Sequence, residues 1–234
     1  MQSIHVITEN NEYGGKTTEI VYATNDEEFT NGFSKSVLFY DREGKLVKRE
    51  LHVNGENPKN QKAAMIIEYY DEQEKQIKSD IYFRDDPIKE KFPYRLVNYF
   101  NSVGQIVKEE AYYRDLPETE MSFRTIIFHY DAEERITKQE MYFSDDYANK
   151  SGFSAIIHHL DRDGNVVKAE IFSSDGMAQL TGISGAVYYY DADGNETETE
   201  YYYTDEYAKT HGCIREITIY SPFKKCETKE PSDD

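Results

Sequence analysis

The sequence predicts an all-β fold, an antiparallel β-meander built from tandem hairpins of thirty residues. A Tyr-Asp dipeptide or a close variant recurs every thirty residues without insertion or deletion, at Tyr40-Asp41, Tyr70-Asp71, Phe100-Asn101, Tyr130-Asp131, Leu160-Asp161, Tyr190-Asp191 and Tyr220-Ser221. Tyrosine accounts for 21 of 234 residues, which favours strands, and no helical spacing of apolar residues is sustained. Such a period indicates a repeat architecture in which units stack on their neighbours. The repeat continues without a linker, so residues 1–234 are expected to form a single domain.

Each repeat has two β-rich segments around a turn, as in Ser36–Tyr40, Asp41–Gly44 and Lys45–Val53. The Asp side chain can accept a hydrogen bond from the backbone two residues on, and Gly can adopt positive φ. Asp-x-x-Gly therefore suits a type I turn closed by a G1 bulge. Glycine recurs at Gly104, Gly164 and Gly194, but Glu74 and Glu134 replace it in two hairpins. Those two turns are expected to be strained, because a side chain disfavours positive φ.

A three-residue loop would place Phe39 opposite Val47 and Val37 opposite Arg49. This register predicts an apolar face, with the columns Val37, Ile67, Val97, Ile127, Ile157, Val187, Ile217 and Leu51, Ile81, Ala111, Met141, Ile171, Tyr201. It predicts an opposite face with lysines, acids and tyrosines, namely Lys48, Lys78, Lys108, Lys138, Lys168, then Glu50, Asp80, Glu110, Glu140, Glu170, Glu200, then Tyr40, Tyr70, Tyr130, Tyr190 and Tyr82, Tyr112, Tyr142, Tyr202.

Loops are expected between the hairpins, for example at Asn54–Lys62, Arg84–Lys91 and Ser144–Gly152. The whole chain would then form about sixteen strands, more than the usual four to six, so the sheet must coil or close on itself. A parallel β-solenoid of the same period is the rival architecture. The tight turns favour the meander, because parallel neighbours cannot be joined by a hairpin.

Composition limits the partners. The formal charge of −18 and the pI near 4.8 argue against nucleic acid or an anionic membrane as a partner. No segment is apolar enough to cross a bilayer, and residues 1–5 lack a basic segment followed by an apolar one, so we expect a cytoplasmic protein. Met1 and the acidic tail 230–234 suggest a complete chain. The two cysteines, Cys213 and Cys226, are expected to be free thiols.

No motif indicates catalysis, a cofactor or a metal. His129 and His159 share one column and lack metal-ligand spacing, so we interpret them as replacements for tyrosine. Acids recur in the loops, at Asp85-Asp86, Asp145-Asp146, Asp175 and Asp205-Glu206. Two adjacent acids are too few to hold calcium, so solvated loop tips are the better interpretation.

The remaining candidate is the surface with tyrosine and charged columns. Tyrosine offers contact area and a hydroxyl at a low entropic cost, which suits the binding of sugars or peptides. The alternative is that these tyrosines only pack on one another across strands. The candidate binding residues are Tyr82, Tyr112, Tyr142, Tyr202, Lys108, Glu110, Lys138 and Glu140.

The repeats Phe39–Lys48 and Tyr189–Glu196 resemble two groups of bacterial sequences. One is the extended β-meander accessory domain of glycosyltransferases that modify serine-rich adhesins and wall teichoic acids, which helps to hold acceptors or partner subunits. The other is the tyrosine-aspartate repeat of secreted toxin shells. The resemblance transfers no catalytic residue, because nothing in this chain could form the nucleotide-sugar domains.

These observations predict a non-catalytic binding or scaffold module. The apolar sheet face is expected to bind a protein partner or to self-associate, since large exposed apolar patches mark interfaces. Two alternatives remain open. One is a glycan-binding or glycosyltransferase-accessory subunit that uses the tyrosines, and the other is an acidic immunity or inhibitor protein with a basic toxin as partner.

Overall fold

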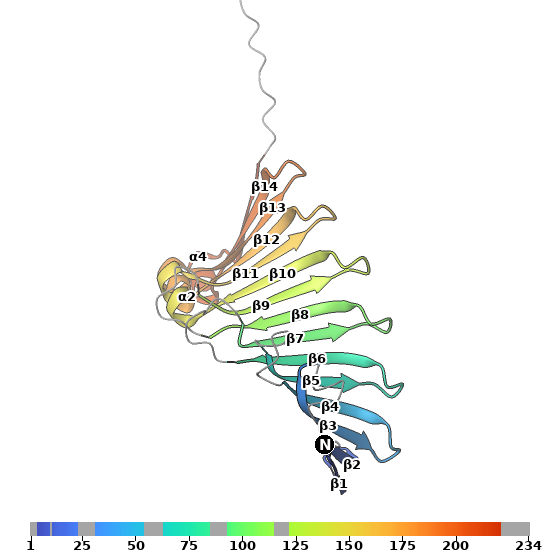
Figure 1. Ribbon diagram of the computed structural model, residues 1–234. Coiled ribbons are helices and arrows are strands. Elements are labelled where there is room, and N and C mark those ends of the chain that lie inside the picture. Colours follow the sequence, from blue (N-terminus) through green and yellow to red (C-terminus); the bar gives the residue numbers. More distant parts are fainter. Residues whose placement is uncertain are drawn as a thin grey trace, which may run out of the picture.

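The computed structural model describes residues 4–9, 11–22, 31–53, 63–84, 93–114 and 122–220. These residues form one antiparallel sheet of 15 strands, in which every strand pairs with its neighbours in sequence from β1 to β15 (Figure 1). The predicted β-meander is confirmed, and the parallel solenoid is wrong. The strands add up to one fewer than the sixteen expected for the whole chain.

The first eight strands are β1 (Ile4–Glu9), β2 (Gly14–Val21), β3 (Phe33–Asp41), β4 (Leu46–Val53), β5 (Ala63–Tyr70), β6 (Gln76–Phe83), β7 (Arg95–Phe100) and β8 (Ile106–Tyr112). The others are β9 (Phe123–Tyr130), β10 (Ile136–Phe143), β11 (Phe153–Leu160), β12 (Val166–Ser173), β13 (Ile183–Tyr190), β14 (Glu196–Tyr203) and β15 (Arg215–Ile219). The described ranges also contain three short helices, α2 (Asp145–Ser151), α3 (Asp175–Thr181) and α4 (Asp205–His211).

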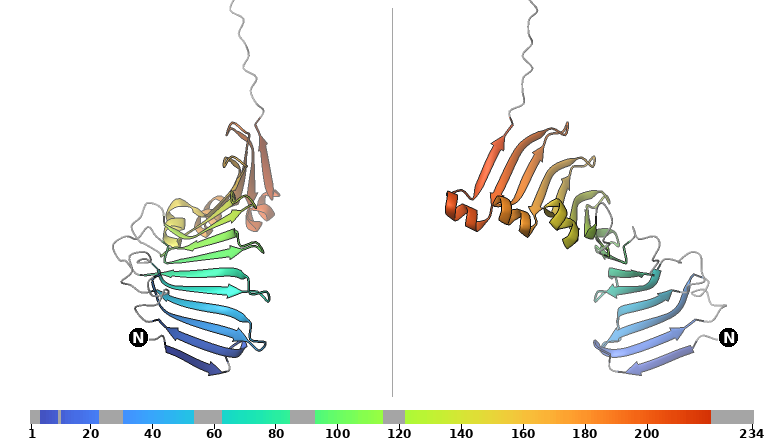
Figure 2. Two further views of the ribbon diagram at one scale, coloured as in Figure 1. Left: turned by 45° about the vertical axis from the view of Figure 1, so that its right-hand side comes forward. Right: turned by 90° about the vertical axis from the view of Figure 1, so that its left-hand side faces the viewer.

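The sheet is open and strongly twisted rather than closed (Figure 2). The hairpin turns lie at one end of the strands, and the three helices lie together at the other end (Figure 1). Of the helices in the described ranges, none is long and apolar enough to cross a membrane.

The hairpin turns have the predicted chemistry. Asp41 Oδ1 accepts hydrogen bonds from the backbone N–H groups of Glu43 and Lys45, both at 2.9 Å. Gly44 has a φ of 84°, while Glu74 and Glu134 have φ values of 57° and 61°. The expected positive φ at both glutamates is therefore confirmed.

Replacing Glu134 by glycine is expected to raise the free energy of unfolding by about 0.5–1 kcal/mol, because it removes left-handed strain. Glu134 is the better test site, since Glu74 Oε1 also accepts a hydrogen bond from the Leu46 N–H at 3.0 Å. Gly164→Ala is the reciprocal control. An added Cβ would have open space around it, but the backbone φ of 86° would strain an alanine. Chemical denaturation measures both changes; equal stability of all three proteins would contradict the argument.

The expected pairing is wrong by one residue beyond the turn. Tyr40 pairs with Leu46, but Phe39 pairs with Lys48 and Val37 with Glu50, so Val47 is the extra residue of a bulge. The predicted turn included a G1 bulge, but the predicted pairing did not count the extra residue that such a bulge adds to the strand. Because side chains alternate in a strand, this shift moves whole columns between faces. The Val37 column joins the acids, and the Tyr40 column moves away from them.

The corrected register defines two faces. The tyrosine face has three rows that run across the strands. The acid row reads Glu19, Val37, Glu50, Ile67, Asp80, Val97, Glu110, Ile127, Glu140, Ile157, Glu170, Val187, Glu200, Ile217. The lysine row reads Phe39, Lys48, Tyr69, Lys78, Tyr99, Lys108, His129, Lys138, His159, Lys168, Tyr189. The tyrosine row reads His52, Met65, Tyr82, Arg95, Tyr112, Thr125, Tyr142, Ala155, Phe172, Gly185, Tyr202, Arg215.

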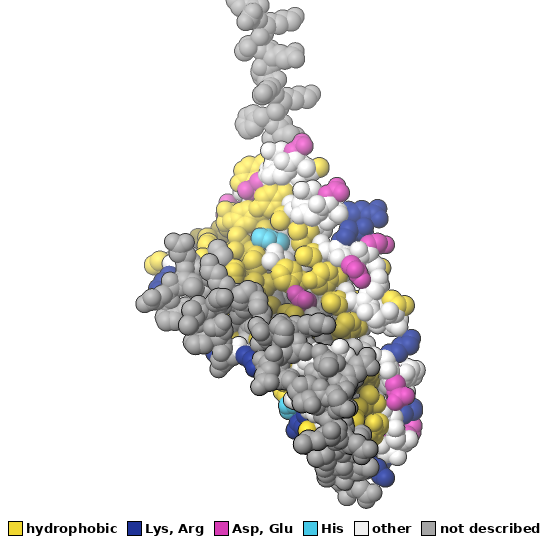
Figure 3. Space-filling model, in the orientation of Figure 1, with side chains coloured by type: hydrophobic (Ala, Val, Ile, Leu, Met, Phe, Trp, Pro, Cys, Tyr) yellow, Lys and Arg dark blue, Asp and Glu magenta, His cyan; other side chains and the backbone are white. Residues whose placement is uncertain are grey.

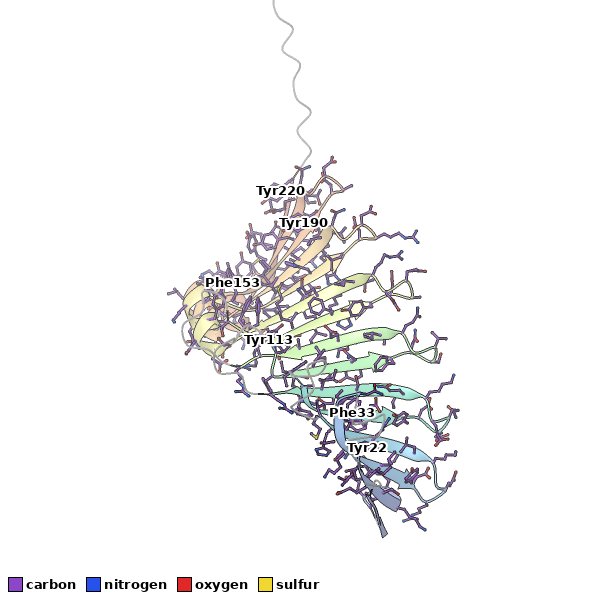
Figure 4. The ribbon with its side chains drawn as sticks, viewed as in Figure 1. Tyr22, Phe33, Tyr113, Phe153, Tyr190 and Tyr220 are labelled. Atoms are coloured by element: carbon purple, nitrogen blue, oxygen red, sulfur yellow. The ribbon has the colours of Figure 1, made fainter. Side chains whose placement is uncertain are left out.

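The opposite side is the aliphatic face. Its central row reads Leu51, Ile66, Ile81, Leu96, Ala111, Ile126, Met141, Ile156, Ile171, Ala186. Aromatic residues of this face, such as Phe33, Tyr113, Phe153 and Tyr190, are labelled along the sheet in Figure 4.

The core of this single layer lies within the rows themselves. Val97, between Asp80 and Glu110 in the acid row, is only 1% exposed, and the neighbouring acids are also buried. Long side chains of the lysine and tyrosine rows flank this row on both sides. The middle of the acid row is thus buried, although no second layer of strands or helices in the described ranges lies above it.

The loop expected at Ser144–Gly152 is instead helix α2. Ser144 Oγ accepts from the Tyr147 N–H, and Gly152 ends the helix with a φ of 85°. Ser174 with Gly182, and Thr204 with Gly212, begin and end α3 and α4 in the same way. The acids that were expected at loop tips in these segments lie in the first turns of the three helices, where they interact favourably with the helix dipole. Asn54–Lys62, Asp85-Asp86 and the rest of Arg84–Lys91 beyond Arg84 lie outside the described residues.

Candidate binding face

All eight candidate residues lie on the tyrosine face, but they do not form one site. Tyr82 is on β6 and Tyr202 on β14, so eight strand spacings, roughly 38 Å, separate them. The sheet brings together two groups of three, on β8 (Lys108, Glu110 and Tyr112) and β10 (Lys138, Glu140 and Tyr142), with β9 between them.

Each of these groups is centred on a carboxylate. Glu110 forms an ion pair with Lys108 at 2.7 Å and accepts a hydrogen bond from the Tyr112 hydroxyl at 2.8 Å. Glu140 pairs with Lys138 at 2.9 Å and accepts from the Tyr142 hydroxyl at 2.6 Å. The strand before supplies a further partner, Tyr99 for Glu110 at 3.2 Å and His129 for Glu140 at 2.7 Å.

These contacts keep the glutamates ionised. Burial would raise the pKa of Glu140, but the hydrogen bonds from Tyr142, Lys138 and His129 outweigh it and lower the pKa to about 2. The pKa of Glu110 is lowered by the same balance. Burial and the bond to Glu110 raise the pKa of Tyr112 to about 12. Groups held in this way are poorly matched to acid–base catalysis near neutral pH.

The lowered pKa of Glu140 predicts a loss of stability in acid. In an unfolded chain glutamate titrates near 4.3, so the contribution is complete above about pH 5 and is lost as the pH falls towards 2. Glu140→Gln is expected to cost about 2–3 kcal/mol of unfolding free energy at pH 7 and almost nothing near pH 2. Denaturation curves at both pH values measure this. Asp163→Asn, at an exposed turn, is the charge-matched control; a pH-independent cost of Glu140→Gln would contradict the prediction.

Arg95 was not among the residues predicted from the sequence, although it forms a bidentate ion pair on this face. Its guanidinium donates to both oxygens of Asp80, at 2.7 and 2.6 Å. It also lies between the rings of Tyr82 and Tyr112, 5.5 and 5.1 Å from their centroids. Aligning the repeats shows Thr125, Ala155 and Gly185 at the equivalent position, so comparison of the columns could have revealed it.

The lysine row is an alternation of ammonium groups and rings. Lys48 lies 4.4 Å from the Phe39 centroid, Lys78 lies 5.1 Å from that of Tyr69, and Lys108 lies 5.3 Å from that of Tyr99. His129 and His159 occupy ring positions in this row, as predicted. The tyrosines of this face therefore contact cations and carboxylates.

No group of three or more metal-ligating side chains gathers anywhere in the described ranges. Cys213 is a free thiol, as predicted, whereas Cys226 lies outside the described residues. A comparison with models of protein families found no match, and neither did a comparison with curated proteins. The chain is therefore classified by its architecture, as an open antiparallel β-meander of tandem hairpins.

Proposed function

We propose that this protein is a non-catalytic binding module that engages a protein partner on the open aliphatic face of its sheet. The observation that carries the proposal is a row of half-buried side chains on four successive strands, Ile126, Met141, Ile156 and Ile171. In the described part of the chain, no second layer of strands or helices covers these strands (Figure 2).

The composition of the aliphatic face limits the contact area to its C-terminal half. Beside the central row, β4, β5 and β8 place Arg49, Glu68 and Glu109, whereas β9, β12 and β13 place Phe128, Ala169 and Tyr188. Figure 3 shows hydrophobic side chains gathered over the upper strands of the sheet. Gln139 and His158 lie between Phe128 and Ala169 in this second row, and the apolar residues around them form a surface of the kind that usually marks an interface.

A shallow cavity in this region offers a place for a partner's side chain. It measures about 390 Å³ and is lined by His158, Val166, Ala169 and Tyr190 among others. Phe153, at the helix end of β11, is 40% exposed. On the other face, Glu110 and Glu140 are kept ionised by several partners each, which supports a role without catalysis.

The test is capture from source-cell lysate with the wild-type chain and with Phe153→Ser. Phe153 is exposed, so its loss is expected to leave the fold intact, which circular dichroism checks. Val103→Ser is the matched control, because Val103 is an exposed apolar residue in a distant hairpin turn. We expect at least one protein that wild type and Val103→Ser retain and Phe153→Ser loses.

Light scattering of the purified chain separates a partner from self-association. A dimer that Phe153→Ser dissociates would replace the partner with a second copy of this chain. A monomer that binds no apolar dye and retains no protein in a Phe153-dependent way would overturn the proposal.

The resemblance to accessory domains of glycosyltransferases names one class of partner for the same experiment, a glycosyltransferase catalytic chain. Titration with cell-wall polysaccharides and adhesin peptides, followed by tyrosine fluorescence, tests the glycan-binding alternative. A basic toxin retained through the acidic residues would favour the inhibitor alternative.

A further inference from the structure

The tyrosine face contains one complete guanidinium site, and the chain fills it with its own Arg95. Asp80 forms its floor and is 3% exposed, while Tyr82 and Tyr112 form two walls. The walls stand on β6 and β8, two strand spacings or about 9.5 Å apart, which leaves room for one planar cation between the rings.

The same arrangement recurs ninety residues, or three repeats, further along. Glu170 takes the place of Asp80, Phe172 of Tyr82, and Tyr202 of Tyr112. The pairings match as well, since Gly185 pairs with Phe172 and Tyr202 as Arg95 pairs with Tyr82 and Tyr112. At the central position, however, arginine is replaced by glycine.

A cavity of about 360 Å³ lies at this position, and it is lined by Glu170, Phe172, Gly185 and Tyr202 together with Lys168 and Tyr189. The carboxylate at its floor is more open than that of Asp80, with 24% of the Glu170 side chain exposed. His159 and Lys168 both bond its Oε1 atom, at 2.7 and 2.9 Å. No donor among the described residues reaches Oε2.

Neighbouring positions of the tyrosine row lack this combination. At Thr125 and Ala155 the central residue carries a side chain, and the acids Glu110 and Glu140 receive tyrosine hydroxyls on Oε2. Phe172 has no hydroxyl, so Glu170 keeps that oxygen available. Met65 fills the position between His52 and Tyr82.

We propose that the Gly185 slot binds the guanidinium of an arginine side chain presented by another protein. The cation would lie between Phe172 and Tyr202 and donate to Oε2 of Glu170, as Arg95 does in the filled site. Lys168 does not prevent this, because its equivalent, Lys78, lies over the rings of Tyr69 and Tyr99 beside the filled site. Lys168 already lies 5.9 Å from the Tyr189 centroid.

Arginine fits the slot better than lysine. A guanidinium is planar, stacks between rings and can donate two parallel hydrogen bonds to a carboxylate, while an ammonium group cannot. The net charge of −18 would also attract a cationic partner. The slot is on the tyrosine face, so its occupant is independent of the contact proposed for the aliphatic face.

The test is a titration of the full-length chain with N-acetyl-arginine amide, followed by the NMR signals of Gly185, Phe172 and Tyr202. N-acetyl-lysine amide and the neutral citrulline analogue serve as comparison ligands. We expect saturable shifts with the arginine compound and at least about tenfold weaker binding of the other two, the effect of one strong charged contact.

Two variants test the floor and one wall separately. Glu170→Gln is expected to weaken arginine binding at least about tenfold, whereas Asp163→Asn, which makes the same change of charge at an exposed turn, leaves it unchanged. Phe172→Ser removes an exposed wall residue and is expected to abolish saturation, so it tests the slot even if Glu170→Gln perturbs the sheet. The absence of saturable shifts, or shifts that both slot variants retain, would overturn the inference. Capture through Phe153 would be unaffected by that result.

Discussion

Replacing Arg95 by alanine is expected to lower the free energy of unfolding by about 3 kcal/mol, because it leaves the Asp80 carboxylate buried without its cation. Asp80 is 3% exposed, and both of its oxygens accept hydrogen bonds from this one guanidinium. The estimate lies at the lower end for buried pairs, since the Arg95 side chain itself is partly exposed. Chemical denaturation at neutral pH measures the change.

A double variant separates the free-energy cost of the unpaired Asp80 charge from the cost of the lost packing of Arg95. Asp80→Asn combined with Arg95→Ala removes both charges, so it is expected to recover part of the lost stability. Arg95→Lys keeps the charge but not the two-pronged geometry, and its stability should be intermediate. A cost below about 1 kcal/mol for Arg95→Ala would show that the pair is as weak as a surface ion pair.

Replacing Gly182 by alanine is expected to cost about 3 kcal/mol, from two sources of similar size. Gly182 ends α3 with a φ of 77°, where any side chain is strained. An added Cβ would also clash with Cδ2 of Tyr207, whose ring is stacked between Tyr203 and His211. Because the Tyr207 ring is packed on both sides, it could move away from the added Cβ only at a cost in free energy.

Two equivalent glycines provide matched controls for Gly182→Ala. Gly212 has a φ of 72° but no atom near an added Cβ, so Gly212→Ala is expected to cost only about 1 kcal/mol, the strain alone. At Gly152 the nearest atom is Cε of Met177, the end of a flexible side chain, so Gly152→Ala should fall between the two. Denaturation of the three variants gives the order, and equal costs would rule out the contact with Tyr207 as a cause.

The repeat pattern was sufficient to predict the architecture, because turn chemistry is local. Asp41 and Gly44 carry their signal within four residues, and the same reasoning identified positive φ at Glu74 and Glu134. To predict which residues share a face of the sheet, the extra residue of the bulge at Val47 has to be counted, because it moves the side chains beyond it to the opposite face. The three helices have seven residues each, too short to show an apolar period, although Ser or Thr followed by Asp with Gly eight residues later marks both ends.

The candidate site was predicted only in part, for a physical reason. Columns in a sequence show which residues lie in line, and they placed Tyr112, Glu110 and Lys108 correctly on one face. They do not show which partner a side chain reaches, so the bidentate bond between Arg95 and Asp80 could not be deduced from spacing. The empty equivalent at Gly185 becomes visible only beside the filled one.

The alternating acid row has a consequence for the evolution of the chain. Every even-numbered strand from β2 to β14 places an acid between aliphatic residues of its odd-numbered neighbours. Deleting or duplicating residues 126–155 would join Thr125 or Ala155 to a residue of the same kind as before, Ile156 or Ile126. The sheet can thus grow or shrink by whole hairpins, about 9.5 Å at a time, while the alternation of acids and aliphatic residues in the acid row is conserved. Recombination between repeats is therefore a route by which such a protein changes the length of its sheet while it keeps its fold.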